Sequence, residues 1–450
     1  MPYNNERATG DSLWRLEENE SVRQFKGVIR TRNPQENRNF PPVVSPPRRQ
    51  KIIRRIIAID GSSVTMRVQN GFPKAEAALF NAAVILIKID ELLNFETERI
   101  PSPRQLRDLE KVYTMSAVLP GPNVTGTSQD DDTPKKFFRS TVRKEMNFRL
   151  DPNHESLLET FLDITGNVSG QTNLFKCPIE DCEKHIARPR RNDLCSCSNR
   201  ERIYPTDSLR MHERFYDNSS SEQAFTAFRM VIEHLLLVNI LRYFKRNHPP
   251  SWFDEIAFVV DGPLAIFGMP AWLKEHVQNE IADIHNDLVS QGHAGLLLMG
   301  MEKSGEFLDH LEELDWHQTQ GRRQKLPNST AMAPTTEYIY QHITPNPNTQ
   351  KPYGAAVYFG RKVLYKNRSG QHAVVMTPIV NPAGRIPNGT ELAAFPRLGE
   401  VLDIVDDLYT HLYQDGFIPL IRANAHAAIP LRQGQRILAN LFDENSYHPQ

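Results

Sequence analysis

Two short apolar runs in this chain each lead into an aspartate that is followed by glycine. The first run covers 56–59 and leads into Asp60 and a Gly-Ser pair, and the second covers 256–260 and leads into Asp261 and a Gly-Pro pair. Apolar runs of this length are typical of buried strands, and α/β proteins place ligands at the carboxyl ends of such strands. We therefore predict two strands of one sheet, each of which ends in a carboxylate and a turn.

The remaining hydrophobic pattern alternates between helical and strand periods, which predicts an α/β layer. The most apolar helix is expected at 224–244, directly before the second Asp-Gly strand. Further helices are predicted at 74–94, 103–112, 270–291, 305–314, 398–414 and 422–428, and further strands at 295–301, 355–365 and 372–380.

Two segments interrupt this alternation and set the predicted domain boundaries. Residues 1–50 contain a short helix near 13–28 and a linker rich in Pro and Arg, which cannot bury much apolar surface. From 165 to 215 the apolar repeats stop, and Cys, His, Arg and Pro become frequent, so this segment is interpreted as an insertion. The predicted organisation is an arm at 1–50, a core in two parts at 51–164 and 216–450, and the insertion between them.

Composition narrows the class of protein. The chain has 450 residues, of which 39% are hydrophobic and 24% charged, and no segment reaches the roughly 18 uninterrupted apolar residues of a membrane span. Its first residues are polar and unlike a signal peptide, so a cytoplasmic protein that inserts into no membrane is expected. The formal net charge of −1 disfavours a protein that coats DNA passively, but it permits an enzyme that grips DNA in one groove.

The two aspartates and one glutamate are candidate metal ligands. Oxygen ligands suit Mg²⁺ or Mn²⁺, and such ions can activate water for phosphodiester cleavage. For Asp60 and Asp261 the alternative is that each only begins a turn, because Asp-Gly is a common turn pair. Glu233 interrupts the apolar helix, where an acid needs either a cation or a partner, and Arg229 one turn earlier offers a salt bridge instead.

Two further residues are candidates for the same site. His426 lies in a segment of small residues near the end of the chain, where it can bind metal or shuttle a proton, although a lone histidine is more often structural. Lys303 follows the strand predicted at 295–301 and can neutralise a phosphate or orient water there. A surface lysine at a strand end is the ordinary alternative.

All four cysteines fall within 21 residues, at Cys177, Cys182, Cys195 and Cys197. A reduced compartment disfavours disulfides, and four thiolates in so short a span fit a structural Zn²⁺ that replaces a hydrophobic core. The spacing differs from paired C-x2-C motifs, so a nearby histidine can take the place of one cysteine. The candidates for that exchange are His185 and His212.

Five motifs follow one another in a characteristic order over 52–98 and 222–437. They are Ile59-Asp60-Gly61-Ser62, Glu233 within a helix, Val260-Asp261-Gly262-Pro263-Leu264, Met299-Gly300-Met301-Glu302-Lys303-Ser304, and Gly416-Phe417-Ile418-Pro419-Leu420 leading to Ala425-His426. In this order and placement the chain resembles the NurA nuclease family. It departs from compact members in the long interval before Glu233 and in the cysteine-bearing insertion.

The resemblance implies an RNase H-like mixed sheet flanked by helices, into which the small zinc-binding segment predicted from the cysteines would be inserted. It implies a metal-dependent DNA nuclease active on single strands and 5′ ends, and a homodimer that docks on a hexameric HerA-type ATPase translocase in DNA end processing or in defence against invading DNA. Carried over by position, Asp60, Glu233 and Asp261 bind Mn²⁺ or Mg²⁺, His426 completes the site, and Lys303 supports it.

Two other classes of function remain as alternatives. The chain can be a non-catalytic adaptor that docks on an ATPase ring and binds DNA through the insertion, although intact acids argue against this role. It can also be a zinc-containing DNA-binding regulator, but no recognition helix stands beside the cysteines.

Overall fold

A computed structural model provides the structure of the protein. It describes residues 15, 18–28, 40–48, 52–68, 74–90, 110–166, 174–179, 182–196, 201–317, 322–323, 326–345, 352–381, 391–410 and 416–429.

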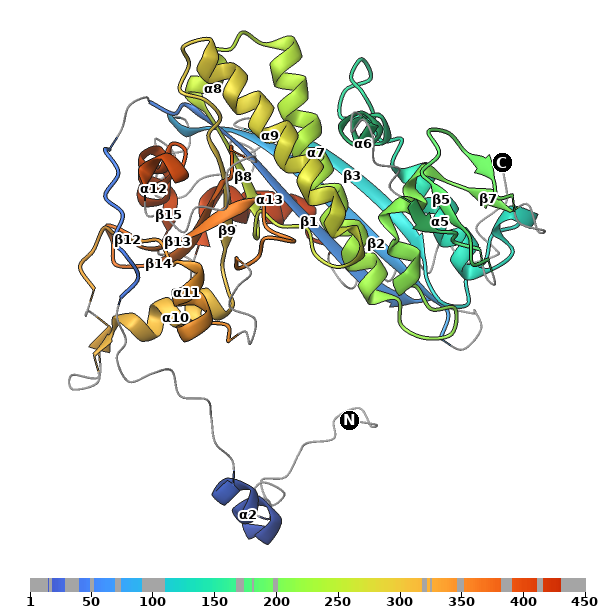
Figure 1. Cartoon of the computed structure of the whole chain (residues 1–450), viewed down its shortest axis with the longest axis horizontal. Helices are drawn as coiled ribbons and strands as arrows, with labels where there is room; N and C mark the ends of the chain where they lie inside the picture. The colour runs from blue at the N-terminus through green and yellow to red at the C-terminus, as the bar shows by residue number, and fades with distance from the viewer. Residues whose placement is uncertain are drawn as a thin grey trace, which may run out of the picture.

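The molecule is built on a sheet of eight strands in the order β12-β13-β14-β9-β8-β1-β2-β3 (Figure 1). β1, β2 and β3 form an antiparallel meander, and β8 and then β9 run parallel to β1 on its other side. This arrangement is the strand order of RNase H-like sheets, and the predicted fold class is confirmed. The strands are β1 (Arg55–Arg67), β2 (Glu76–Lys88), β3 (Glu110–Pro120), β8 (Ile256–Asp261), β9 (Leu298–Glu302), β12 (Thr330–Met332), β13 (Gly360–Lys366) and β14 (His372–Pro378).

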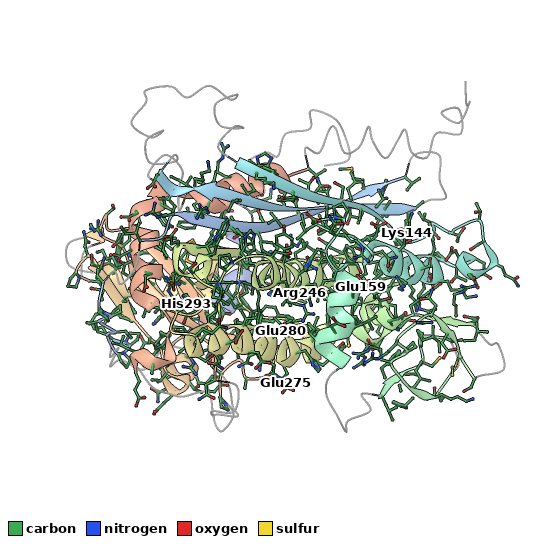
Figure 2. The ribbon with its side chains drawn as sticks, turned by 90° about the horizontal axis from the view of Figure 1, so that it is seen from above. Lys144, Glu159, Arg246, Glu275, Glu280 and His293 are labelled. Carbon is green, nitrogen blue, oxygen red and sulfur yellow. The ribbon has the colours of Figure 1, made fainter. Side chains whose placement is uncertain are left out.

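Helices cover both faces of this sheet. On one face, here called the α7 face, Ile57 and Ile59 of β1 pack in a core with α5 (Pro134–Glu145), α6 (Leu157–Gly166), α7 (Glu222–Asn247) and α9 (Leu273–Ser290). On the opposite face, the α13 face, Ile56 and Ala58 pack with α12 (Leu398–Leu408) and α13 (Ile418–Ala427). Figure 2 shows α7 and α9 side by side beneath the strands. Alternate residues of β1 therefore enter two different cores.

The helix α7 is the central helix of the α7 face. Its apolar residues surround most of its circumference, as expected for a helix enclosed by a sheet and other helices. It is the one helix in the described part of the chain with the length and apolar composition of a membrane span, but 72% of that apolar window is buried within the protein. We conclude that α7 is a core helix, as the sequence predicted for 224–244.

Several other predicted elements are also present. Four predicted helices are present. The helix predicted at 270–291 is α9, and the one at 305–314 is α10 (Glu306–Asp315). The helix predicted at 398–414 is the shorter α12, and the one at 422–428 is α13, which begins earlier. The strands predicted at 295–301, 355–365 and 372–380 correspond to β9, β13 and β14, and the last two pair as expected. Further described elements are α2 (Glu20–Val28), α8 (Trp252–Glu255), α11 (Thr336–His342), and the two-residue strands β10 (Trp316–His317), β11 (Arg322–Arg323), β15 (Tyr409–Thr410) and β16 (Gly416–Phe417).

The helix predicted at 74–94 is wrong, because 76–88 form the strand β2. β2 lies between β1 and β3 and is buried on both faces, so both its odd and its even positions are apolar. A run that is apolar at nearly every position contains helical spacings by chance, which explains the error. Of the helix predicted at 103–112, residues 103–109 lie outside the described residues, and 110–112 belong to β3.

The turn predicted after Asp60 is also wrong. β1 continues through Gly61 and Ser62 to Arg67 and stays paired with β2 over its whole length. Its parallel partner β8 pairs with β1 only as far as Ile59 and Val260. Asp60 thus stands where the parallel ladder ends, although its own strand does not end there. The turn after Asp261 is confirmed, since Gly262 has a φ of +98°.

The predicted insertion folds as a small unit beside α5. It contains two hairpins, β4 (Leu174–Lys176) with β5 (His185–Ala187) and β6 (Asp193–Leu194) with β7 (Arg202–Ile203). The predicted arm touches the core at its end, where Val44 donates its backbone N–H to Ala331 of β12 and Arg48 forms an ion pair with Asp406 at 2.7 Å. The domain boundaries at 50, 164 and 215 stay a prediction.

Candidate active site

The two aspartates singled out by the sequence lie on neighbouring parallel strands and on the same face of the sheet. Val259 pairs with Ala58 in the α13-face core, and Val260 pairs with Ile59 in the α7-face core. Because side chains alternate along a strand, Asp60 and Asp261 both return to the α13 face one residue later. Two carboxylates thus stand next to each other where the β1–β8 ladder ends.

Asp60 is buried, with only 7% of its surface exposed. Burial is the main cause that raises its pKa to about 6, and the negative charge of Asp261 raises it further. Lys303 and Arg229 act in the opposite direction. A carboxylate in this setting is costly to ionise unless a cation approaches, which is the environment of a metal ligand or a general base.

Lys303 joins the same group of side chains from β9. Its ammonium donates to Asp261 Oδ2 at 2.9 Å, and both side chains remain partly exposed. The lysine therefore stands at the mouth of the site with one edge open to solvent. Its predicted role of binding an anionic group that approaches the aspartates stays a prediction.

Glu233 approaches this place from the other face of the sheet. It extends from α7 toward β1, where Gly61 has no side chain, and a Cβ on Gly61 would lie 3.0 Å from Glu233 Cδ and still closer to its Oε1. A glycine is thus required for the carboxylate to rest on the strand next to Asp60. The sequence analysis did not identify Gly61 as the place where Glu233 approaches β1.

The environment of Glu233 bears on the two predicted roles of this acid. Burial raises its pKa to about 8, the charge of Arg229 opposes this, and the charges of Asp60 and Asp261 add to it. Arg229 Nε lies 3.8 Å from Glu233 Oε1, with 39% of the arginine side chain exposed. An ion pair this long and this exposed is weak, so it does not compensate for the burial of the acid.

His426 lies on α13, which crosses β1 and β2 on the face of Asp60. Leu420 and Ala423 of this helix pack near Ile56 and Ala58, whereas Ile429 packs beyond Asp60 against Met66, Ala77 and Leu79. The helix therefore passes Asp60 between these two contacts, and His426 falls in that interval. The structure places the histidine on the correct face, and its role as a metal ligand stays a prediction.

The carboxylates approach one another without closing into a compact ligand set. Among the three described residues Asp60, Glu233 and Asp261, at least one separation between ligand atoms exceeds 4.8 Å. The donor set suits a hard divalent cation, because it offers carboxylate oxygens. Burial also disfavours the ionised form of Asp60 and Glu233 unless a cation binds nearby.

A second group of candidate ligands lies in the insertion. The sulfur atoms of Cys177, Cys182 and Cys195 lie within 4.8 Å of one another, with Cys177 Sγ 3.3 Å and Cys182 Sγ 3.9 Å from Cys195 Sγ. All three are buried, and burial is the main cause that raises the pKa of Cys177 to about 12. Three converging cysteines can hold a metal ion. Cys197, the fourth predicted ligand, lies outside the described residues.

Neither histidine considered as a substitute ligand joins this group among the described residues. His185 is exposed on β5. His212 is buried near Asp207, with its Nδ1 at 4.0 Å from Asp207 Oδ1, and burial lowers its pKa to about 4. His212 is therefore a neutral histidine of the core beside α5.

Sequence reasoning missed polar residues on β2 and β3 that lie beside Asp60. Asn81 pairs with Ser62 on one side and with Ser116 on the other, one row further along the strands from Asp60. These residues had no visible relation while 74–94 was interpreted as a helix. The signal that could have found them is the single asparagine within the apolar run of β2.

Comparisons with known proteins returned two solved structures of NurA nucleases. No family model matches the sequence, and no curated protein matches it. The chain is similar to the NurA nuclease from Sulfolobus solfataricus, with a TM-score of 0.34, 8% identity and 98% of each chain covered. It is also similar to a second NurA structure, with a TM-score of 0.26, 10% identity, and 97% of this chain and 98% of the other covered.

Proposed function

We propose that the chain is a DNA nuclease that depends on Mn²⁺ or Mg²⁺ and uses Asp60, Glu233, Asp261 and His426 as metal ligands. The observation that carries this proposal is the burial of Asp60 and Glu233 beside Asp261 where two parallel strands part. Acids with raised pKa values in such a place are unfavourable for stability alone. Their grouping is therefore better explained by a function that supplies a cation.

The residues of the site suit hydrolysis of a phosphodiester. A divalent cation bound by the carboxylates lowers the pKa of water and stabilises charge on phosphate oxygens. Lys303, at the open edge beside Asp261, binds a phosphate oxygen of the incoming strand. His426, on the helix that crosses Asp60, would complete the ligand set with an imidazole nitrogen. Gly61 has no side chain, so Glu233 can reach the site from α7.

We also propose that the three buried cysteines, together with Cys197, hold one structural Zn²⁺. The insertion has only a small apolar core around Phe175, Ile179 and Ile203. Such a core stabilises a small segment poorly, and a metal ion compensates for its size. The zinc then holds the two hairpins in place and takes no part in cleavage.

The proposed partners are a second copy of the chain and a hexameric HerA-type ATPase translocase, which feeds DNA to the nuclease during end processing or defence against invading DNA. The family resemblance supports this part of the proposal, and so does α2 on the arm. Val22, Phe25 and Val28 of α2 follow one another at helical spacing and are 37%, 62% and 77% exposed. An apolar stripe left exposed on a helix is suited to docking in a groove of a partner protein.

The proposal is tested by cleavage of single-stranded and linear duplex DNA with Mn²⁺. We expect Asp60→Ala and Asp261→Ala each to reduce cleavage at least a hundredfold, and Asp283→Asn, an exposed acid on α9, to leave it unchanged. Undiminished cleavage by both alanine variants would remove the assignment of the site. Binding of DNA by a wild-type protein that cleaves nothing with any divalent metal would favour the non-catalytic adaptor.

A further inference from the structure

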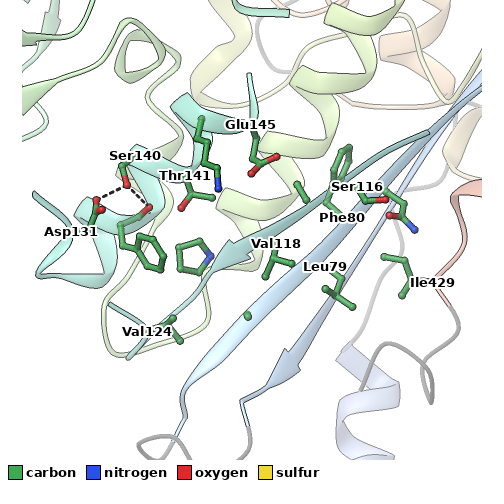
Figure 3. Close-up of a pocket in the computed structure, with 16 residues that line it drawn as sticks. Leu79, Phe80, Ser116, Val118, Val124, Asp131, Ser140, Thr141, Glu145 and Ile429 are labelled. Carbon is green, nitrogen blue, oxygen red and sulfur yellow. Dashed lines mark hydrogen bonds between the residues drawn. The ribbon is translucent and has the colours of Figure 1, made fainter. Parts of the chain in front are cut away.

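A groove lies over β2 and β3 at the edge of the sheet and runs to α5 (Figure 3). It has a volume of about 920 Å³. Its floor is formed by β2 and β3, including Leu79, Asn81, Ser116 and Val118, and its outer wall is formed by α5 with Ser140, Thr141, Lys144 and Glu145. In the structure, β3 is the last strand of the sheet, so nothing in the described chain pairs with its outer edge.

The inner end of the groove is fixed relative to Asp60 by the strand register. Asp60 pairs with Ala83, and Asn81 lies two residues further along β2, on the same face of the sheet. Diagonal neighbours of this kind are about 7–8 Å apart. Ser116 lies one strand further out, about 5 Å beyond Asn81. The groove therefore leads away from the catalytic acids by a short and direct path.

The surface chemistry along this path changes in a regular way. On the α13 face, the β1 residues nearest to Arg55 are apolar. They are Ile56 and Ala58, and helices cover them. The row of Ser62, Asn81 and Ser116 is polar, and the following row of Val64, Leu79 and Val118 is apolar again. The exposed part of the groove thus combines hydroxyl and amide groups with a flat apolar floor.

The charged residues of the outer wall are one cation, Lys144, and two acids, Asp131 and Glu145. Lys144 is exposed near the end of α5, and no salt bridge in the described part of the chain uses its ammonium. Asp131 accepts hydrogen bonds from Ser140 Oγ and Ser128 Oγ, which satisfies much of its polarity. Burial raises the pKa of Glu145 above its usual range.

We propose that this groove binds the nucleotides of a single DNA strand that adjoin the phosphate cleaved at Asp60 and Asp261. This inference rests on the proposed function and names the path of its substrate. Asn81 and Ser116 hydrogen bond to sugar and phosphate oxygens, the apolar floor accepts base or sugar faces, and Lys144 neutralises one phosphate. Recognition by hydroxyl, amide and lysine groups without base-edge contacts is independent of sequence.

The inference is tested with two variants and two substrates. Lys144→Glu removes the cation, and Ser116→Trp fills the groove from an exposed position on β3. We expect each variant to weaken the binding of a 20-nucleotide single strand about three- to tenfold, measured by fluorescence anisotropy with Ca²⁺. For Lys144→Glu, the slope of log K against log salt should also fall in magnitude by about one. Hydrolysis of thymidine 5′-(p-nitrophenyl phosphate), which cannot reach the groove, should remain within twofold of the wild type.

The outcomes separate the two proposals. If the wild type hydrolyses neither substrate, the proposed function is wrong and the groove inference falls with it. If the wild type cleaves both substrates while both variants bind and cleave the long strand normally, only the groove inference is wrong. A third outcome is that Ser116→Trp changes the oligomeric state, measured as molecular mass by light scattering, and leaves DNA binding intact. The groove would then be a protein interface, and the inference would be overturned. Lys245→Glu, an exposed lysine on α7, is the charge-matched control and should leave DNA binding unchanged.

Discussion

The carboxylate of Glu233 provides the most informative perturbation, because its two possible roles predict opposite changes in stability. If it is a metal ligand, the metal-free protein contains a buried charge with no adequate partner. Glu233→Gln keeps the shape and removes the charge, so the metal-free variant should be more stable than the wild type. If Glu233 serves only a salt bridge to Arg229, the same change removes a favourable pair and the variant should be less stable.

The magnitude follows from the pKa of Glu233. It is raised from 4.5 to about 8, so between these values the folded protein binds more protons than the unfolded chain. The free energy of unfolding of the metal-free protein therefore falls as pH rises through this range. With 1.36 kcal/mol for each pKa unit, the loss between pH 5 and pH 8 is about 3–4 kcal/mol for this group alone. Coupling to Asp60 and the partial exposure of Glu233 reduce the expected gain of Glu233→Gln at pH 8 to about 2–4 kcal/mol.

The assay is thermal and urea unfolding in the presence of a chelator at pH 5, 6.5 and 8. We expect Glu233→Gln to match the wild type at pH 5 and to exceed it at pH 8, with a melting temperature several degrees higher. Added Mn²⁺ should stabilise the wild type more than the variant, and the variant should lose cleavage. Glu222→Gln, an exposed glutamate at the start of the same helix, serves as the control and should change stability by less than about 0.5 kcal/mol. A destabilised Glu233→Gln at pH 8 with full cleavage would refute the role of Glu233 as a ligand.

Three further predictions concern neighbouring residues. Gly61→Ala should displace the Glu233 carboxylate and reduce cleavage at least tenfold while the melting temperature is kept, and normal cleavage would show that the close approach is irrelevant. Lys303→Met removes a charge that lowers the pKa of Asp60, so the acid limb of the pH–rate profile for Mn²⁺-dependent cleavage should move to higher pH; an unmoved limb would contradict the coupling. Cys182→Ser should reduce zinc content from about one ion per chain to near none by metal analysis, with cleavage retained, and zinc-free wild-type protein would remove the zinc site.

The sequence predicted the adjacent positions of Asp60 and Asp261 better than it predicted β2, the strand next to Asp60. Asp60 and Asp261 were found because each follows an apolar run and precedes glycine, and the carboxyl ends of neighbouring parallel strands meet at one place in a sheet. β2 was mistaken for a helix because a strand buried on both faces loses the alternation that identifies strands. Without β2 as a strand, its pairing with β1 and β3 could not be predicted. The polar row of Ser62, Asn81 and Ser116 was therefore missed.

Glu233 illustrates a different limit. A carboxylate in an apolar helix is visible in the sequence, but whether it meets a cation or a salt-bridge partner depends on what the helix packs against. That information comes from Gly61, which lies 172 positions earlier and whose missing side chain admits the acid. The cysteines were easier to interpret, since thiols concentrated in a short segment tend to converge wherever the segment folds.

The central claim is that Asp60 and Asp261 bind the divalent ion that drives cleavage. It is tested most directly by titrating Mn²⁺ into the wild type and into Asp261→Asn, with free Mn²⁺ followed by electron paramagnetic resonance and cleavage of a single strand measured on the same samples. We predict that the wild type binds Mn²⁺ and cleaves, and that Asp261→Asn binds at least tenfold more weakly and loses cleavage in proportion. Equal Mn²⁺ affinity and equal cleavage in the two proteins would contradict the claim.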